Sequence, residues 1–407
     1  MTMKRPLEGI RVIDFGWRAV APIGARMLAW GGAEVIRVET ASRHDGARLT
    51  PPQTPGKESS FNTSAWFNNL NSNKMSISLN LRKPLGKDLA LRLVTLGDVV
   101  TENFSAGVMD RLGLGYEDLR KVCPDIIMIS HSLAGIWGPN KRISGHGPMG
   151  AAMAGFHSIA GWPDMDPISP GAAYTDFITN AHQSSFVLMA ALLHRRRTGE
   201  GQYIDLSQIE AVINNTGTMM LDYTANGRIM DRLGNRDELA APHGIYQCRG
   251  DEQWCAIAVF SQEDWERLAG VMGRPELIHD SRFSTFEGRK ANEDTLDEIV
   301  EEWTSQLDAQ GLTVLLQEAG IPAGAVQNAR EVMEDPQIIA RNHFRRVVHS
   351  EAGETTYDGP PFRFSETDEQ EVLAAPMLGE HNDWVFNELL GLGEEEVISG
   401  YVDEVFV

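Results

Sequence analysis

Short apolar runs alternate with helical patterns through the first half of the chain. The run GIRVIDF at residues 9–15 is rich in β-branched residues, and small apolar residues at helical spacing lead from it through a Gly-Gly pair into a second run, AEVIRVE. Four more runs lie at residues 74–81, 98–104, 125–135 and 202–207, with helical patterns between them. Strands that alternate with helices at this spacing predict an α/β fold, in which helices cover both faces of a mostly parallel sheet.

The second half of the chain has a different pattern. One long apolar helix is expected from about Ala172 to Arg197, where three arginines and Gly199 are typical of a helix C-terminus. Residues 226–242 are polar and irregular, and HGIYQCRGDEQWCAIAVF after them predicts antiparallel strands around a turn. Amphipathic helical patterns follow in residues 260–340. The change in composition near residue 226 predicts a domain boundary.

The length and charge of the chain limit its class. Its 407 residues exceed what one hydrophobic core usually supports, which favours two domains. The 57 acidic and 36 basic residues give a net charge of −21, which repels nucleic acid and anionic membranes, so we expect neither as a partner. No apolar run reaches the roughly 20 residues that span a bilayer, no signal peptide is recognisable, and the three cysteines form no CxxC pair. These features predict a cytoplasmic location.

The absence of cofactor motifs excludes several classes of enzyme. The first strand-to-helix turn, DFGWRAVAPIG, lacks GxGxxG, so a nicotinamide cofactor is not expected. The 11 histidines include no HExxH and no HxH, so we expect no metal.

Arg82 and Arg111 follow predicted strand ends, where guanidinium groups can hold phosphates bidentately. The alternative is that both arginines are solvated surface residues.

Asp176 is the carboxylate with two competing interpretations. It lies near the predicted start of the long helix, where the helix dipole and backbone N–H groups favour an ionised carboxylate by roughly 0.3–1 kcal/mol. An ordinary helix cap and an ionised nucleophile share these features, so the position alone leaves both open. His146 lies 30 positions earlier (176 − 146), in the glycine-rich ISGHGPMG, and approaches Asp176 only if the fold brings the two together.

Six stretches, taken in order, resemble the class III CoA-transferases, the family of formyl-CoA transferase, carnitine CoA-transferase and the α-methylacyl-CoA racemases. They lie within residues 7–215 and read GIRVIDF, LAWGGAEVIRVE, SISLNLRKPLGKDL, VVTENFSAGVMDRLGLGYEDL, AYTDF and HRRRTGEGQYIDLSQIEAV. The resemblance implies coenzyme A as the substrate and acyl carrier. It also implies a large Rossmann-like domain of residues 1–225 completed by residues 336–407, a smaller α+β domain of residues 226–335, and an interlocked homodimer.

The resemblance further implies roles for individual residues. The family's catalytic aspartate falls on Asp176. Its coenzyme A contacts fall on five positions: Leu79, Arg82, Asn103, Phe104 and Arg111. An arginine that the family often has just after the second strand is Thr40 here, and a glutamine in the first strand-to-helix turn is Ala19.

The implied reaction moves coenzyme A from an acyl-CoA donor, such as succinyl-CoA, to a carboxylic acid. The Asp176 carboxylate attacks the donor thioester to give a mixed anhydride, the released thiolate returns to make an aspartyl thioester, and the acceptor acid reverses both steps. Two alternatives stay open. An α-methylacyl-CoA racemase would use His146 and Asp176 as an acid/base pair on the carbon next to the thioester. A non-catalytic acyl-CoA-binding subunit would serve a heteromeric transferase.

Overall fold

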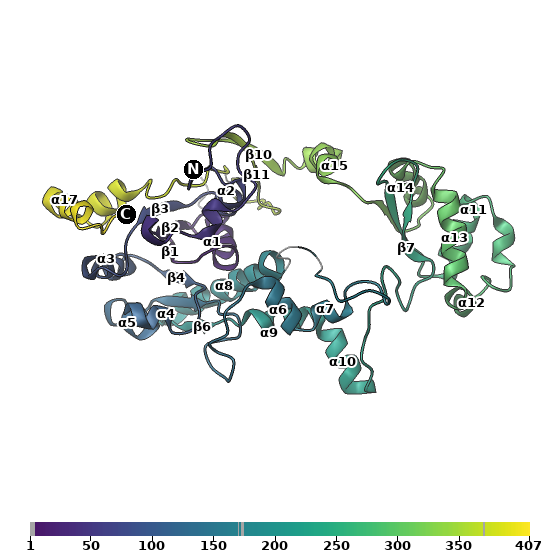
Figure 1. The fold of residues 1–407 in the computed structure, drawn as a ribbon, viewed down its shortest axis with the longest axis horizontal. Helices are drawn as coiled ribbons and strands as arrows, with labels where there is room; N and C mark the ends of the chain where they lie inside the picture. The colour runs from purple at the N-terminus through teal and green to yellow at the C-terminus, as the bar shows by residue number, and fades with distance from the viewer. Residues whose placement is uncertain (1–4, 170, 172–174, 369–370) are drawn as a thin grey trace. The chain divides into compact units, whose positions relative to one another are not determined.

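The computed structural model describes residues 5–169, 171, 175–368 and 371–407, which divide into two compact units (Figure 1). Unit 1 comprises Met1–Phe156, Ser169–Ile229 and Ile339–Val407. Unit 2 comprises His157–Ile168 and Met230–Ile338.

The described part of unit 1 contains a six-stranded parallel sheet. Its strands are β1 (Arg11–Asp14), β2 (Glu34–Glu39), β3 (Met75–Ser78), β4 (Val99–Glu102), β5 (Ile127–Ser130) and β6 (Tyr203–Asp205). Their order is β3-β2-β1-β4-β5-β6, every neighbouring pair is parallel, and each strand lies in one of the six predicted runs. The predicted α/β fold is confirmed. Because the strand order reverses between β1 and β4, a crevice is expected outside the carboxyl ends of these strands.

Helices cover both faces of this sheet. The described helices of unit 1 are α1 (Val20–Trp30), α2 (Ala65–Leu70), α3 (Pro84–Val94), α4 (Val108–Leu112), α5 (Tyr116–Val122), α6 (Gly147–Met153), α8 (Ala181–Thr198), α9 (Gln208–Ile213), α10 (Gly217–Asn226) and α17 (Glu394–Val402). Val12 of β1 packs in a core with α1, α8 and α9, whereas its neighbour Ile13 packs in a core with α3 and α5. Adjacent strand residues are both buried because they point to opposite, covered faces, which explains the unbroken apolar runs.

The last residues of the chain pack beside its first strands (Figure 1). Phe386 and Phe406 stack on each other and belong to the same core as Ile13 and Ile36. A hairpin of β10 (Phe344–His349) and β11 (Gly353–Asp358) precedes this segment, and the sequence analysis did not predict it. Among the described residues, no helix has the length and apolar character of a membrane span.

The long helix predicted from residue 172 differs in its first turns. Residues 172–174 lie outside the described residues, and residues 175–180 form a π-helical turn before α8 begins at Ala181. The helix ends as predicted, with basic residues in its last turn and Gly199 in the left-handed conformation.

Unit 2 is a small α+β assembly, in agreement with the predicted fold class. An antiparallel sheet in the order β7-β8-β9 packs with helices, and the elements are β7 (His243–Gln247), β8 (Trp254–Ala258), β9 (Ala323–Ala325), α11 (Gln262–Val271), α12 (Phe286–Ala291), α13 (Glu293–Thr304), α14 (Ala309–Glu318) and α15 (Ala329–Glu334). Its core is built from Trp265, Phe283, Leu296 and Leu312. Two short helices, α7 (Phe156–Ile159) and α16 (Pro336–Ala340), lie at the points where the chain passes between the units.

Candidate active site

A cavity of about 570 Å³ lies at the carboxyl ends of four neighbouring strands of unit 1. The segments that follow β1, β2, β3 and β4 line it, together with residues 144–146, Asp176 and Gln208. We call it the strand-end cavity. It brings together all seven site residues predicted from the sequence, which are Leu79, Arg82, Asn103, Phe104, Arg111, His146 and Asp176.

The Asp176 carboxylate is nearly buried in the wall of this cavity, with 7% of the residue exposed. Its Oδ2 accepts a hydrogen bond from the backbone N–H of Gly147 at 3.2 Å, whereas its Oδ1 has no hydrogen-bond partner within the described residues. Burial raises the pKa of this carboxyl to about 6, and the Gly147 N–H and the nearby His146 limit the rise. At neutral pH, Asp176 therefore presents an ionised oxygen with little solvation, the state that a nucleophile requires.

Among the described residues, no backbone N–H of its own helix donates to the Asp176 carboxylate. It lies within the π-helical turn Thr175–Asn180, and the N-cap residue of α8 is Asn180, which makes no side-chain capping bond. Its hydrogen-bond partner, Gly147, is the first residue of a different helix, α6. The cap interpretation is therefore wrong for α8. Single π-helical turns inside helices are rare and occur frequently at functional sites.

Gly147 is required by the close approach of this carboxylate. A Cβ at position 147 would lie 2.4 Å from both Cγ and Oδ1 of Asp176 and 2.5 Å from its Oδ2. These separations are far below van der Waals contact, so any side chain at position 147 displaces the carboxylate or the start of α6. The sequence analysis missed this residue, although it lies directly after His146 in the glycine-rich stretch.

His146 is the N-cap residue of α6, and its exposed side chain lines the same cavity as Asp176. It is close enough that its charge lowers the pKa of the Asp176 carboxyl. The fold therefore brings together the two residues that the sequence separates by 30 positions.

Asn103 joins the turns that follow β1 and β4. Its Oδ1 accepts from the backbone N–H of Trp17 at 2.7 Å, and its Nδ2 donates to the Trp17 carbonyl at 2.8 Å. The ring of Phe104 meets the ring of Trp17 edge to face, with 5.5 Å between centroids. The backbone N–H of Phe104 donates to Oε2 of Glu102 at 2.7 Å, and burial raises the pKa of Glu102 to about 7. The hydrogen bond to Glu102 therefore helps to fix the Asn103–Phe104 turn.

Each of the four strand ends supplies one arginine to the cavity. Arg18 follows β1, Arg43 follows β2, Arg82 follows β3 and Arg111 follows β4. In the part of the chain that the structure describes, none of these four guanidinium groups forms an ion pair with a carboxylate. The sequence analysis found Arg82 and Arg111 but missed the other two, although the same signal, an arginine shortly after a strand, marks all four.

A buried ionic network lies against this cavity and neutralises its own charges. Arg37 contacts Asp14 at 3.6 Å, Glu39 at 2.8 Å and Asp45 at 2.5 Å, and all four side chains are inaccessible to solvent or nearly so. Glu39 also pairs with Arg48 at 2.5 Å. Against the cost of burial, Arg48 and Arg37 hold the pKa of Glu39 at about 2. Although Glu39 lines the cavity, its charge is therefore already matched.

The positions at which the sequence departs from the family pattern also line the cavity. These are Thr40 and Ala19. Leu79 is almost fully buried, and its backbone N–H donates to the Glu39 carbonyl at 2.6 Å, which fixes the chain after β3 beside the end of β2.

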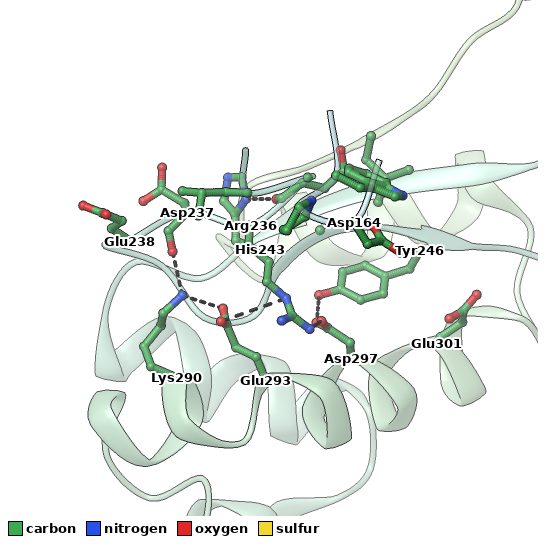
Figure 2. Close-up of a pocket in the computed structure, with 17 residues that line it drawn as sticks. Asp164, Arg236, Asp237, Glu238, His243, Tyr246, Lys290, Glu293, Asp297 and Glu301 are labelled. Atoms are coloured by element: carbon green, nitrogen blue, oxygen red, sulfur yellow. Dashed lines mark hydrogen bonds and ion pairs between the residues drawn. The ribbon is translucent and has the colours of Figure 1, made fainter. Parts of the chain in front are cut away.

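A cavity of about 760 Å³ lies wholly within unit 2, lined by β7, α13 and residues around Trp162 (Figure 2). Its cations are paired within it, because Arg236 contacts Asp297 at 2.8 Å and Lys290 contacts Glu293 at 2.6 Å. The Tyr246 hydroxyl donates to Asp297 at 2.8 Å. Since these cations already have carboxylate partners, this cavity is less suited to an anionic ligand than the strand-end cavity is. No group of His, Cys, Asp and Glu residues suited to a metal ion occurs among the residues described.

Comparison with known proteins identifies the family. A family model described as CoA-transferase family III matches residues 7–382. The chain belongs to this family. This class III CoA-transferase is 35% identical over 97% of its length to the succinyl-CoA–D-citramalate CoA-transferase of Chloroflexus aurantiacus, of which it covers 96%. It is 31% identical over 98% of its length to the formyl-CoA:oxalate CoA-transferase of Streptomyces coelicolor, of which it covers 98%.

Solved structures agree with this assignment. The class III CoA-transferase matches a CAIB/BAIF family protein from Brucella suis with a TM-score of 0.86 and 31% identity, covering 95% of this chain and 99% of that one. It matches Rv3272 from Mycobacterium tuberculosis with a TM-score of 0.80 and 25% identity, covering 94% and 99%. The predicted family and fold class are confirmed, and the protein is an enzyme that transfers coenzyme A between an acyl-CoA and a carboxylic acid.

Proposed function

We propose that the strand-end cavity is the active site of this CoA-transferase and that Asp176 is its nucleophile. The observation that carries the proposal is a buried carboxylate that opens on a cavity with four guanidinium groups. Within the described ranges, one oxygen of this carboxylate has no hydrogen-bond partner and the four guanidinium groups have no ion-pair partner. The substrates are anionic at both ends of the reaction, since coenzyme A carries phosphates and the acids carry carboxylates. A cationic cavity in a chain with a net charge of −21 provides the local attraction that they require.

The reaction conserves the thioester bond energy at every step. The Asp176 carboxylate attacks the carbonyl of the donor thioester and the C–S bond breaks. This step forms a mixed anhydride between Asp176 and the donor acyl group and releases coenzyme A as a thiolate. The thiolate attacks the aspartyl carbonyl, which releases the donor acid and leaves an aspartyl thioester. The acceptor carboxylate attacks this thioester to form a second anhydride, and the thiolate then takes the acceptor acyl group and frees Asp176. Asp176 is nearly buried, so little water reaches the anhydrides formed on it. This favours transfer over hydrolysis of the anhydrides.

The coenzyme A binding roles proposed for Leu79, Arg82, Asn103, Phe104 and Arg111 fit their places in the cavity. Arg82 and Arg111 have unpaired guanidinium groups for phosphates. Asn103 and Phe104 form a rigid turn, because their hydrogen bonds and rings are fixed by Trp17 and Glu102.

We propose succinyl-CoA as the donor and a small dicarboxylic acid as the acceptor. Relatives named for succinyl-CoA transfer to D-citramalate and to L-malate are 35% and 32% identical to this chain. A cavity with several unpaired arginines favours an acid with a second carboxylate over a monocarboxylic acid.

The test is exchange of coenzyme A between succinyl-CoA and a panel of free acids by the purified chain. Asp176→Asn should lower the exchange rate at least a thousandfold, because the amide cannot form the anhydride. Asp88→Asn is the matched control, since Asp88 is exposed on α3 and does not line the cavity. Mass spectrometry after hydroxylamine treatment during turnover should place a hydroxamate on Asp176. Full exchange activity in the Asp176→Asn variant would remove the basis of the proposal.

The same panel separates the alternatives. His146 lines the cavity beside Asp176, and this observation keeps the α-methylacyl-CoA racemase as the second candidate. A racemase would remove the optical activity of a 2-methylacyl-CoA without any free acid.

We also propose that the enzyme acts as a homodimer in the cytoplasm. Phe186 on α8 and Leu221 on α10 are 74% and 69% exposed, and large apolar side chains left in contact with water favour burial against a second copy. Light scattering on the purified chain should give twice the mass of 45.0 kDa calculated for one chain.

A further inference from the structure

We infer that Arg18 and Arg43 form a second oxyanion site in the strand-end cavity, distinct from Arg82 and Arg111. Its ligand is a charged group of the substrates, either a phosphate of coenzyme A or the free carboxylate of a dicarboxylic acid. The inference rests on the proposed function for the identity of the ligand, because that function supplies the substrates.

The order of the strands places this pair between the other two arginines. In the sheet, β2 and β1 lie between β3 and β4. The segments after β2 and β1, which carry Arg43 and Arg18, therefore lie between the segment after β3, which carries Arg82, and the segment after β4, which leads to Arg111 on α4. An anion held by Arg18 and Arg43 occupies the middle of the cavity rather than either end.

Arg18 is held in a backbone conformation that arginine rarely adopts. Its φ is +60°, in the left-handed region that favours glycine. Its backbone N–H donates to Oδ2 of Asp45 at 2.8 Å, and Asp45 is fixed in turn by Arg37 at 2.5 Å. A strained residue persists only where the surrounding structure enforces it, and such residues concentrate at ligand-binding sites. The strain has no structural benefit for a solvated arginine, because glycine would suit the turn better.

The guanidinium of Arg18 reaches toward the end of β2. A Cβ at Gly46, which follows β2, would lie 3.1 Å from Nη2 of Arg18. Arg43 also follows β2, at the end of the short 3-10 helix Ala41–Arg43. The guanidinium of Arg18 therefore reaches the segment after β2 that also carries Arg43.

The guanidinium of Arg43 lies over the ring of Trp17, 5.6 Å from its centroid. Trp17 is held by two hydrogen bonds to Asn103, so Arg43 rests on a rigid surface. Stacking uses the face of the guanidinium and leaves its N–H groups at the edge free to donate.

The nearby carboxylates do not neutralise this pair. Glu39 and Asp45 lie close by, but their charges are matched by Arg37 and Arg48 in the buried network. Two positioned guanidinium groups without ion-pair partners in the described residues form a site for an oxyanion from outside the chain.

The test uses Arg18→Gly and Arg43→Gln, with Arg346→Gln as the control. Arg346 is 81% exposed on β10 and does not line the cavity. Arg18→Gly removes the guanidinium and relieves the positive φ, so its melting temperature should stay the same or rise. Loss of binding in that variant therefore cannot be attributed to unfolding.

Two arms distinguish the sources of the oxyanion. Calorimetry needs no turnover and is carried out with coenzyme A and with 3′-dephospho-coenzyme A. If the oxyanion is a phosphate of coenzyme A, both variants should bind coenzyme A about tenfold more weakly than the control does. Steady-state exchange from succinyl-CoA to isotopically labelled succinate and to butyrate addresses the carboxylate, because the label makes transfer to succinate visible. A carboxylate ligand predicts that KM for succinate rises about tenfold while KM for butyrate stays within twofold.

Either pattern supports the site and names its ligand. The proposed site is overturned if, in both variants, the affinity for coenzyme A and the KM for succinate stay within twofold of the control values. The proposed function fails on a separate result, full exchange by the Asp176→Asn variant, and the calorimetric arm is independent of that outcome.

Discussion

The contact between Gly147 and Asp176 provides the sharpest test of how this site works. In Gly147→Ala, the new Cβ would lie 2.4 Å from Cγ of Asp176, and ordinary contact begins at 3.4 Å. The carboxylate must therefore move by about 1 Å (3.4 − 2.4), away from the N–H that holds it at 3.2 Å. Gly147 does not have a positive φ, so alanine is compatible with the backbone and the effect is confined to this contact.

A displacement of about 1 Å in a reacting group costs on the order of a hundredfold in rate. We expect kcat for exchange to fall about a hundredfold, which corresponds to roughly 2.7 kcal/mol of transition-state stabilisation. KM for the acyl-CoA should change little, because the arginines of the cavity are untouched. Overpacking should also lower the free energy of unfolding by about 1–3 kcal/mol.

The assay is steady-state exchange, with urea unfolding measured on the same preparations. Gly150→Ala is the matched control, because it adds a methyl group to the same helix, where the nearest atom would be Leu133 Cδ1 at 3.3 Å. We expect Gly150→Ala to keep its activity. If both variants show the same kcat, the position of the Asp176 carboxylate does not govern turnover, and the reasoning is refuted.

Three further predictions concern buried charges. Because burial raises the pKa of Asp176 in the free enzyme from 3.8 to about 6, kcat/KM should rise with pH through about 6 and then level off. A flat profile of kcat/KM from pH 5 to 8 contradicts an ionised nucleophile. Burial raises the pKa of Glu102 from 4.5 to about 7, so the folded state loses stability as pH rises between those values. Glu102→Gln keeps an acceptor for the Phe104 N–H. In urea unfolding, its free energy of unfolding should equal that of wild type at pH 4 and exceed it by about 3 kcal/mol at pH 8. Equal free energies of unfolding at both pH values would refute this. Arg37→Met leaves the buried Asp45 without its cationic partner and should cost about 3–5 kcal/mol by the same measurement, and a loss below about 1 kcal/mol would show that the network contributes little.

The site residues predicted from the sequence share one feature. Arg82 and Arg111 were found after predicted strand ends, whereas Asn103 and Phe104 were taken from the family resemblance. All four follow strands, and the carboxyl ends of parallel strands meet at one edge, which explains why one cavity contains them. Arg18 and Arg43 obey the same rule and were missed. The sequence analysis tested the turn that carries Arg18 only for a nucleotide-binding motif. It did not consider that the Arg18 side chain would lie at the same edge of the sheet as Arg82 and Arg111.

The features nearest to the chemistry were the least predictable. The π-helical turn at Thr175–Asn180 replaces what the pattern predicts as regular helix, since the sequence there carries apolar residues that suit either form. The β10–β11 hairpin was missed because FRRVVH and GETTYD carry charged and polar residues on their exposed face and have weak strand signals.

The sequence by itself determined the six strands of the large sheet and their layered arrangement with helices, because burial between two helical layers forces apolar runs on the strands and a helical period between them. It also carried the motifs by which the family is recognised. Only the tertiary structure decided which groups meet: the N–H of Gly147 faces the carboxylate of Asp176, the guanidinium of Arg18 reaches Gly46, and that of Arg43 lies over Trp17. These contacts depend on packing between segments far apart in the chain, and no local period or spacing records a long-range contact.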